Sequence, residues 1–389
     1  MRVLYLLNIS NLNRLSADSG WIFADLLAPA LADLGQEVTV AAPARAGDER
    51  CHFLPTSAPG SKYRARLGAD IDALRILVEA GEPDVVVVNQ IEEAPAVRTA
   101  LLEAGSAARL VGYAHYLPFT PTDNNGVLVD PAFDDAGLGR SILLTFAAGL
   151  AACDRILVHS TTATNWVTAA ASTAGVDIAD RLRVVPAPRD PRLVHAPTPT
   201  NHPARDGGEV AVTAIYNHRL YAHYGTARFL DLARELAVSG RVRLRVMDLF
   251  GQRSTERTGL DDSPERMRDE LAGLSGVQVV SDRGDRIRYR NLLAGARFGI
   301  APFRPGCPWS MSVIDCQSMG LPVIAPRMGW FAEHIDPALC FTTRAEAVAL
   351  AERLALDDAF HAHHAAHAFA TTTHLAPSLV AARYLEAIS

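Results

Sequence analysis

Short apolar runs alternate with amphipathic segments through the first 190 residues of the chain. Residues 84–88 (DVVVV) form a β-branched run, which is typical of a parallel strand buried on both faces. Apolar residues from Ile22 to Leu34 recur at helical spacing, and Gly35 follows as a stop signal. Further strands are predicted at residues 3–7, 38–42, 110–113, 156–159 and 182–185. This alternation predicts a parallel sheet with right-handed helical crossovers.

The same rhythm restarts after a change in composition. Residues 186–208 contain six prolines and no long apolar run, so we expect a linker there. A helix is predicted at residues 227–237, and strands at residues 210–215, 242–249, 277–280, 298–301, 321–324 and near Cys340.

These two halves predict an α/β protein with two Rossmann-like, doubly wound parallel-sheet domains that face a central cleft. We place the first domain at residues 1–190 and the second at residues 205–374, and we expect a C-terminal helix at residues 375–389 to pack back on the first. Ligands of such sheets bind at the carboxyl ends of the strands.

Composition narrows the class of protein. A net charge of −6 without a large basic block argues against a general nucleic-acid binder. The longest apolar stretch, residues 142–153, is shorter than the roughly 20 residues of a membrane span, and the N-terminus has no signal-peptide pattern. Five cysteines without a CxxC pair fit reduced thiols. We therefore expect a cytoplasmic protein without a transmembrane segment.

Two candidate sites lie in the first half. The loop from Asn8 to Gly20 precedes a predicted helix, whose first N–H groups could hold an anion such as a diphosphate. The alternative is an ordinary loop. His115 follows a predicted strand, where an imidazole can exchange a proton with a substrate hydroxyl, although a lone histidine is more often structural.

Two more candidate sites lie in the second half. Arg219 follows the first strand there, and its planar fork suits phosphate oxygens, unless it is a surface residue paired with an acid. Residues 303–323 combine a loop, a helix starting at Ser310, and a Gly-Leu-Pro-Val stop. The backbone N–H groups of Ser310, Met311 and Ser312 could hold a phosphate, and Asp315 could accept from a ribose diol. The alternative is a buried packing helix.

Several segments resemble the GT-B glycosyltransferases of the large retaining family 4. The segment SGWIFADLLAPALADLGQEVTVAAP is similar to the family's glycine loop, helix and second strand. AACDRILVHSTTATNWV, LRVVPAPRD and GDRIRYRNLLAGARFGIAPF are similar to three further segments. SMSVIDCQSMGLPVIAP matches the family's most specific signature.

This resemblance implies metal-independent transfer, with retention, from a nucleotide-diphosphate sugar to a hydroxyl or other nucleophile. It implies no cofactor besides that co-substrate and a small-molecule or glycan acceptor. It assigns phosphate binding to Gly20, Arg219, Tyr224, Ser310, Met311 and Ser312, the nucleoside to Asp315, Arg286 and Tyr289, and the sugar side to Cys307 and Trp309. It assigns His115 to the sugar or acceptor side, and it makes His115, Arg219 and Asp315 the candidate catalytic residues.

The chain departs from the family at three of these positions, and one of them is Asp315, a shorter acid where the family has the second glutamate of a conserved pair. Cys307 stands where the family has the first glutamate of a conserved pair, and Tyr224 stands where it has a phosphate-binding lysine. Lys62 is the only lysine in the chain. Two alternatives therefore stay open: a degenerate relative that binds nucleotide-sugar or a partner without turnover, and a nucleotide-sugar epimerase or hydrolase.

The remaining signals say little about the site. His361, His363, His364 and His367 lie in an Ala-rich stretch, where no acid or cysteine follows nearby, so we expect a solvated helix face and no metal site. Replacement of lysine by arginine and a high alanine content suggest a GC-rich bacterial genome, and we expect a role in natural-product or glycoconjugate biosynthesis.

Overall fold

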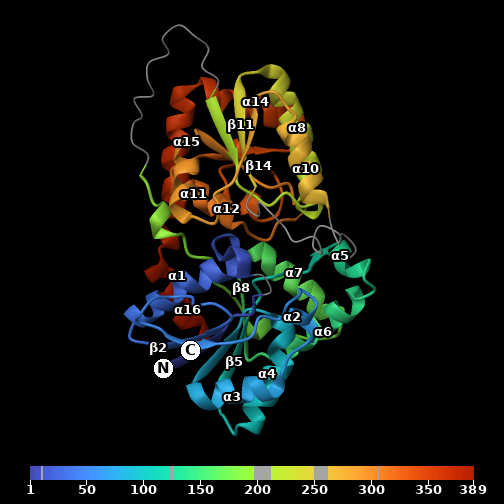
Figure 1. Cartoon of the computed structure of the whole chain (residues 1–389), viewed down its shortest axis with the longest axis vertical. Coiled ribbons are helices and arrows are strands. Elements are labelled where there is room, and N and C mark those ends of the chain that lie inside the picture. The colour runs from blue at the N-terminus through green and yellow to red at the C-terminus, as the bar shows by residue number, and fades with distance from the viewer. Residues whose placement is uncertain (10–11, 123–125, 197–211, 249–261, 305) are drawn as a thin grey trace. The chain divides into compact units, whose positions relative to one another are not determined.

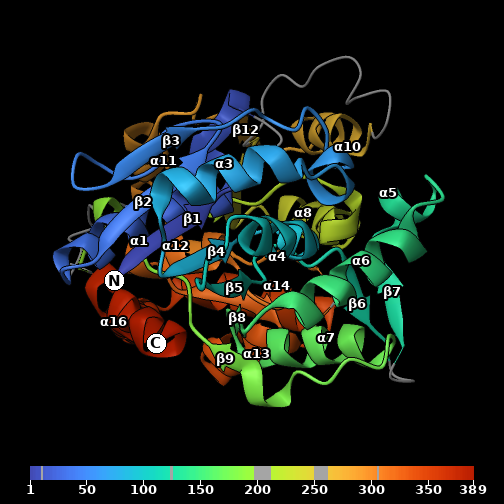
Figure 2. The same ribbon diagram turned by 90° about the horizontal axis from the view of Figure 1, so that it is seen from below.

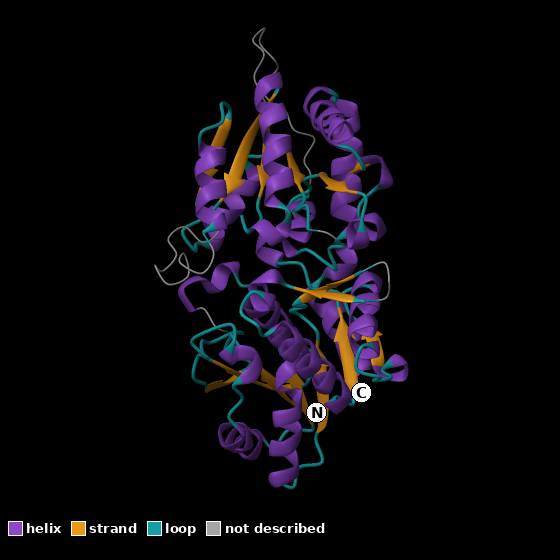
Figure 3. Ribbon diagram, turned by 90° about the vertical axis from the view of Figure 1, so that its right-hand side faces the viewer, coloured by secondary structure: helices purple, strands orange, loops and turns teal. Residues whose placement is uncertain are grey.

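The computed structural model describes residues 1–9, 12–122, 126–196, 212–248, 262–304 and 306–389. The chain divides into two compact units. The N-terminal unit contains residues 1–188 and 375–389, and the C-terminal unit contains residues 189–374. In both units, helices flank a sheet of parallel strands (Figures 1 and 3).

The sheet of the N-terminal unit has the strand order β3-β2-β1-β4-β5-β8-β9, and all of its pairs are parallel. Figure 2 shows these strands in succession across the unit. The strands are β1 (Arg2–Leu6), β2 (Glu37–Ala42), β3 (His52–Pro55), β4 (Val85–Val88), β5 (Arg109–Tyr113), β8 (Arg155–Val158) and β9 (Leu182–Val184). All four residues of β4 are fully buried, because helices cover both faces of the sheet.

The helices of the N-terminal unit are α1 (Ser19–Asp33), α2 (Arg64–Leu67), α3 (Ile71–Gly81), α4 (Ala94–Glu103), α5 (Pro131–Asp134), α6 (Gly139–Ala152), α7 (Thr161–Ser172) and α16 (Pro377–Ile388). The 3₁₀ turns are η1 (Leu12–Ala17), η2 (Ile91–Glu93) and η3 (Ala179–Arg181), and β6 (Phe119–Pro121) and β7 (Val127–Val129) form an antiparallel pair. The C-terminal helix α16 packs against α1, so the end of the chain belongs to the N-terminal unit (Figure 1).

The C-terminal unit repeats this plan with the strand order β12-β11-β10-β13-β14-β15, again with parallel pairs. Its strands are β10 (Val212–Tyr216), β11 (Val242–Met247), β12 (Val277–Val280), β13 (Phe298–Ile300), β14 (Val323–Pro326) and β15 (Cys340–Phe341). Its helices are α8 (Thr226–Ser239), α10 (Ser263–Ala272), α11 (Arg286–Ala294), α12 (Met311–Ser318), α13 (Gly329–His334), α14 (Arg344–Leu356) and α15 (Asp358–Thr371). The 3₁₀ turns are η4 (Pro191–Leu193), η5 (Ala222–Tyr224) and η6 (Pro337–Leu339), and η7 (Thr373–Leu375) ends the unit.

The predicted α/β class with two parallel, doubly wound sheets is confirmed. The sequence analysis missed β3 and the hairpin of β6 and β7, because these strands have only three or four residues and, apart from Phe119, their side chains are partly buried or exposed. The predicted linker at residues 186–208 lies partly outside the described residues, which end at 196 before resuming at 212. Among the described residues, no helix is both long and apolar enough to cross a membrane.

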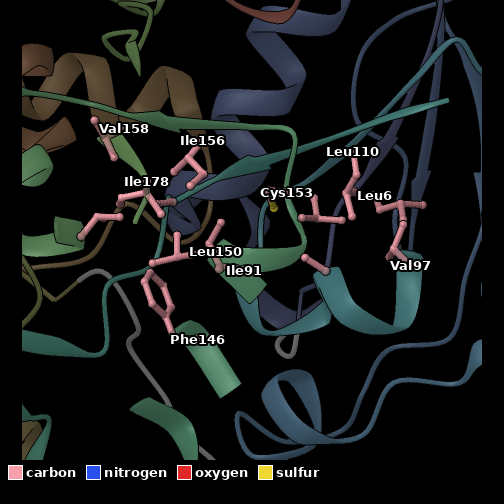
Figure 4. Close-up of a cluster of buried hydrophobic side chains, with 14 of the residues drawn as sticks. Leu6, Ile91, Val97, Leu110, Phe146, Leu150, Cys153, Ile156, Val158 and Ile178 are labelled. Carbon is pink, nitrogen blue, oxygen red and sulfur yellow. The ribbon is translucent and has the colours of Figure 1, made fainter. Parts of the chain in front are cut away.

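The core of the N-terminal unit depends on close contact between α6 and the η2 turn. Gly149 on α6 lies so near the turn that an added Cβ would overlap with the backbone carbonyl of Ile91. Phe146 and Leu150 of the same helix are fully buried beside Ile91 (Figure 4). The absence of a side chain at Gly149 therefore sets the distance between these two elements.

We expect Gly149→Ala to destabilise the N-terminal unit by about 1–3 kcal/mol or more, because backbone atoms would have to move apart. The matched control is Gly81→Ala, also at a helical glycine, where the new Cβ would lie 3.8 Å from the nearest atom. Thermal unfolding of both variants tests this. A Gly149→Ala melting temperature equal to that of the control would contradict the packing described.

Candidate functional site

In each sheet the strand order reverses beside the first strand of its unit. β1 lies between β2 and β4, and β10 lies between β11 and β13. Doubly wound sheets bind their ligands beside the carboxyl ends of the strands at such a reversal. Asn8 and Asn89 follow β1 and β4, and Asn217 follows β10, so polar residues stand at these positions in both units.

Asn217 joins three elements of the C-terminal unit. Its Nδ2 donates to the hydroxyl of Tyr289 on α11 at 2.8 Å and to the carbonyl oxygen of Ser312 on α12 at 3.0 Å. The thiol of Cys316 donates to Asn217 Oδ1 at 3.5 Å. This side chain therefore fixes the loop after β10 against the first turns of α11 and α12.

A buried ionic network surrounds Asp315 on α12. Arg286 donates through Nη2 to both oxygens of Asp315, at 3.3 and 3.2 Å, and through Nε to Asp190 Oδ2 at 2.8 Å. The hydroxyl of Tyr289 donates to Asp315 Oδ2 at 2.9 Å, and Arg192 binds the other oxygen of Asp190 at 2.8 Å. The side chains of Asp190 and Asp315 are 0% and 3% exposed. Protein groups must therefore replace the hydration that these two carboxyl groups lose on burial.

The pKa values of Asp315 and Asp190 shift in opposite directions, although both residues pair with Arg286. Burial raises the pKa of Asp315 above its usual value, and the attraction of Arg286 only partly offsets that shift. Burial also acts on Asp190, but Arg192 and Arg286 together hold its pKa below the usual value. Arg286 therefore favours the ionised form of Asp315, whereas burial disfavours it. Its assignment to ribose binding stays a prediction, since both of its oxygens already accept hydrogen bonds from Arg286 or Tyr289.

The start of α12 lies where the sequence analysis expected it. Ser310 is the N-cap residue, but its hydroxyl bonds to Ser312 Oγ at 2.9 Å and makes no hydrogen bond to the helix backbone. Ser312 Oγ also lies 3.3 Å from His218 Nδ1, in the loop that carries Arg219. Met311 begins the helix and is buried. The helix start and the loop after β10 are therefore adjacent within one unit.

Cys307, predicted on the sugar side, and Tyr224, which replaces the lysine, each have polar or aromatic partners in the C-terminal unit. Cys307 is buried, its thiol donates to the carbonyl of Trp309 at 3.2 Å, and burial raises its pKa to about 11, so it is a neutral thiol at pH 7. The ring of Tyr224 lies 4.6 Å from the His218 ring, and Arg304 stands over it at 5.5 Å. An arginine thus accompanies the tyrosine that stands in place of lysine.

A hydrogen-bonded chain runs through the N-terminal unit behind His115. His115 Nε2 lies 3.0 Å from Ser19 Oγ, and its Nδ1 lies 3.1 Å from His159 Nε2. His159 Nδ1 lies 2.8 Å from the hydroxyl of Tyr113, which donates to the carbonyl of Val185 at 3.3 Å. Burial, followed by the nearby charge of His115, holds the pKa of His159 well below its usual value.

The Tyr113 hydroxyl has one proton, and its donation to the Val185 carbonyl sets one direction for this chain. With the Tyr113 proton on the Val185 carbonyl, His159 Nδ1 donates to Tyr113 and His159 Nε2 accepts from His115 Nδ1. A neutral His115 with its proton on Nδ1 has Nε2 as its acceptor atom, 3.0 Å from Ser19 Oγ.

Gly20 has local partners that the sequence analysis did not anticipate. Its N–H donates to Asp18 Oδ1 at 3.0 Å, and an added Cβ would overlap with the hydroxyl of Tyr116, which itself donates to Asp18 at 2.8 Å. This glycine therefore admits Tyr116 against the start of α1. Its assignment to diphosphate binding stays a prediction.

A carboxyl group that the sequence analysis missed lies beside β1 and β4. The side-chain Nδ2 of Asn8 donates to Glu93 Oε1. The backbone N–H of Asn8 donates to Asn89 Oδ1 at 2.9 Å. Burial raises the pKa of Glu93 to about 8. The hydrogen bond from Asn8 lowers this pKa, and the nearby charge of Glu92 raises it. A carboxyl group that is protonated at pH 7 can donate to a ligand oxygen.

Sequence reasoning also missed Asp190, His159 and Asn217 as members of these networks. Asp190 lies in the segment predicted as linker, and His159 was taken only as a strand end. The one available signal was position: Asn217 and His159 each follow a strand directly, where side chains reach the ligand-binding edge.

We expect Arg286→Ala to lower the stability of the C-terminal unit by about 3–5 kcal/mol, because it leaves two buried carboxylates without this partner. Thermal unfolding of the variant measures the loss. Arg290→Ala, at an exposed position of the same helix, is the matched control and should melt near the wild type. Equal melting temperatures for both variants would show that Arg286 does not neutralise the network.

Comparison with known proteins agrees with this architecture. Residues 22–193 match the sequence profile of Glycosyltransferase Family 4. No protein with a curated description matches the chain.

Solved structures share the fold at low sequence identity. The Anabaena protein HepE, crystallised with UDP and glucose, superposes with a TM-score of 0.69 and 15% identity over 99% of this chain and 98% of its own. Sucrose-phosphate synthase from Thermosynechococcus elongatus superposes with a TM-score of 0.72 and 14% identity, over 99% of this chain and 98% of its own. The trehalose-6-phosphate synthase OtsA superposes with a TM-score of 0.71 and 11% identity, over 100% of this chain and 99% of its own. The chain is therefore a protein of the GT-B glycosyltransferase fold with a family 4-like sequence over residues 22–193.

Proposed function

We propose that the chain is a cytoplasmic, retaining glycosyltransferase that moves a sugar from a nucleotide-diphosphate sugar to an acceptor hydroxyl without a catalytic metal. The match of residues 22–193 to Glycosyltransferase Family 4 supports transfer chemistry. The observation that carries the proposal is the polar cluster of Asn217, Ser312 and Asp315 at the strand reversal of the C-terminal unit. That edge is where a doubly wound sheet binds a nucleotide.

The donor nucleotide would bind at the start of α12. Backbone N–H groups there and the positive end of the helix favour phosphate oxygens, and Arg219 in the adjacent loop supplies a fixed positive charge. HepE has been crystallised with UDP and with UDP-glucose, which makes a uridine nucleotide the first donor to test. In this proposal Asp315 acts mainly by holding Arg286 and Tyr289 at the nucleoside side.

His115 would face a substrate hydroxyl. Its Nε2 lies 3.0 Å from Ser19 Oγ, and a sugar or acceptor hydroxyl that replaced this Oγ would meet the same nitrogen. His159 would act as a positioning residue, since its bond to His115 Nδ1 sets the tautomer.

Binding without turnover is the second candidate, and two residues favour it. Cys307 is a neutral thiol where the resembling enzymes have a carboxylate, and Tyr224 has no positive charge. A thiol is a weak hydrogen-bond acceptor for a sugar hydroxyl. Measurements of binding and turnover on the same variants separate the two functions.

We expect Arg219→Ala to lower the rate of sugar transfer or donor hydrolysis by about 10²-fold or more, because a leaving diphosphate loses its fixed positive charge. Calorimetry with UDP, GDP, ADP and TDP identifies the base, and release of the nucleotide diphosphate from the matching sugar donor measures turnover. UDP should bind more weakly to the variant than to the wild type.

The matched control is Arg243→Ala, an exposed arginine of β11, which should retain wild-type binding and rate. Nucleotide binding without any nucleotide release from the wild type would favour the non-catalytic candidate. No binding of any of the four nucleotides would reject both.

We expect His115→Ala to lower kcat/KM by about 10²-fold, and His159→Gln to move the pH dependence of kcat/KM. Burial holds the pKa of His159 well below its usual value, so the wild type should keep its activity until the pH falls far enough to protonate that buried ring. The pH profile of nucleotide release checks both variants.

His52→Ala, at an exposed residue of β3, is the control and should leave the profile unchanged. A His159→Gln profile that overlays the wild type would show that the buried chain has no part in turnover.

A further inference from the structure

The Ala-rich helix α15 does not have a purely solvated histidine face. Asp336, which precedes η6 and is 27 positions before His363 in the sequence, lies against it. One ligand atom from each of Asp336, His363 and His364 falls within 4.8 Å of the others. The sequence analysis found no nearby acid because this one comes from a different element.

The distances within this group suit a coordination sphere. Asp336 Oδ2 lies 3.1 Å from His364 Nδ1 and 3.8 Å from His367 Nδ1. Ligands about 2.0–2.1 Å from a tetrahedral zinc ion stand about 3.3 Å apart. The ligand atoms of Asp336, His363 and His364, which lie within 4.8 Å of one another, would move closer by side-chain rotation to surround one ion.

The histidine and aspartate side chains are held in place by other contacts. Asp336 Oδ1 accepts from the backbone N–H of Ala338 at 2.9 Å, which leaves Oδ2 directed at α15. His364 is 4% exposed and lies edge-on to the Phe360 ring at 4.3 Å. Its buried Nδ1 has no hydrogen bond of good geometry among the described residues. An inward-facing nitrogen next to a carboxylate oxygen is the arrangement that a metal ion would complete.

An ion could reach this group from solvent. His363 is exposed, and the side chain of His367 is 47% exposed. His361 is excluded from the group, because its Nε2 is bonded to the carbonyl of Arg297 at 2.9 Å.

We propose that Asp336, His363 and His364 bind a divalent transition-metal ion of the zinc type, with His367 available as a fourth ligand. Imidazole nitrogens with one carboxylate oxygen select zinc, nickel or copper over magnesium and calcium, which prefer oxygen ligands.

The bound ion would link two segments of the C-terminal unit. Asp336 lies in the connection between α13 and β15, whereas the histidines lie on α15, which packs against α12. The ion would therefore stabilise α15, which packs against α12, and the start of α12 is the proposed phosphate site. This role is structural and does not depend on the proposed sugar transfer.

Calorimetric titration of chelator-treated full-length protein with Zn²⁺ tests the site, and Co²⁺ absorption reports the ligand geometry. We expect one ion per chain, a higher melting temperature with Zn²⁺, and the absorption of tetrahedral Co²⁺. Asp336→Asn and His363→Ala should each weaken Zn²⁺ binding by about 10-fold or more, since each removes one ligand.

The control is His52→Ala, which removes an exposed histidine of the N-terminal unit and should bind Zn²⁺ as the wild type does. Binding that survives Asp336→Asn at full strength would overturn the site, because the ion would then be held by exposed histidines alone. The absence of stoichiometric binding by the wild type would overturn it as well. UDP binding, measured on the same samples, distinguishes failure of this site from failure of the donor site.

Discussion

The C-terminal unit depends on one buried arginine that is shared by two carboxylates. Arg286 joins Asp190, at the beginning of the unit, to Asp315 on α12, and α11 carries the arginine between them. Buried charges cost several kcal/mol each unless they are paired, so these three side chains have few alternative positions. The network thereby fixes the start of α12, where Ser310 and Ser312 stand, relative to the loop after β10.

The N-terminal unit achieves a comparable rigidity with neutral groups. His115, His159 and Tyr113 form a chain in which each ring fixes the hydrogen-bonding direction of the next. Burial keeps His159 uncharged, so this chain needs no counter-ion. The two units thus hold their polar groups at the carboxyl ends of the strands in different ways: an arginine shared by two carboxyl groups in one, and a chain of imidazole and phenol rings in the other.

The sequence predicted the positions of helices and strands better than it predicted the hydrogen-bond partners of single residues. The helix begins at Ser310 as expected. The hydroxyl of Ser310, however, bonds to Ser312 Oγ and makes no capping hydrogen bond to the helix backbone. Gly20 lies in the first turn of α1, but its N–H donates to Asp18 and the space beside its Cα is filled by the hydroxyl of Tyr116. In both cases the backbone position could be predicted from local sequence, whereas the partners come from side chains whose direction depends on packing.

The sequence alone determined the two α/β domains, their parallel sheets and most strand positions. Apolar periodicity and β-branched runs are local properties, and they specify which face of each element is buried. Only the tertiary structure decided which polar residues meet. Asp190 with Arg286, Asp336 with His364, and Tyr113 with His159 are pairs from separate elements, 96, 28 and 46 positions apart. No spacing rule connects such positions, because their distance in space is set by the order of strands in the sheet and by the helices that cover it.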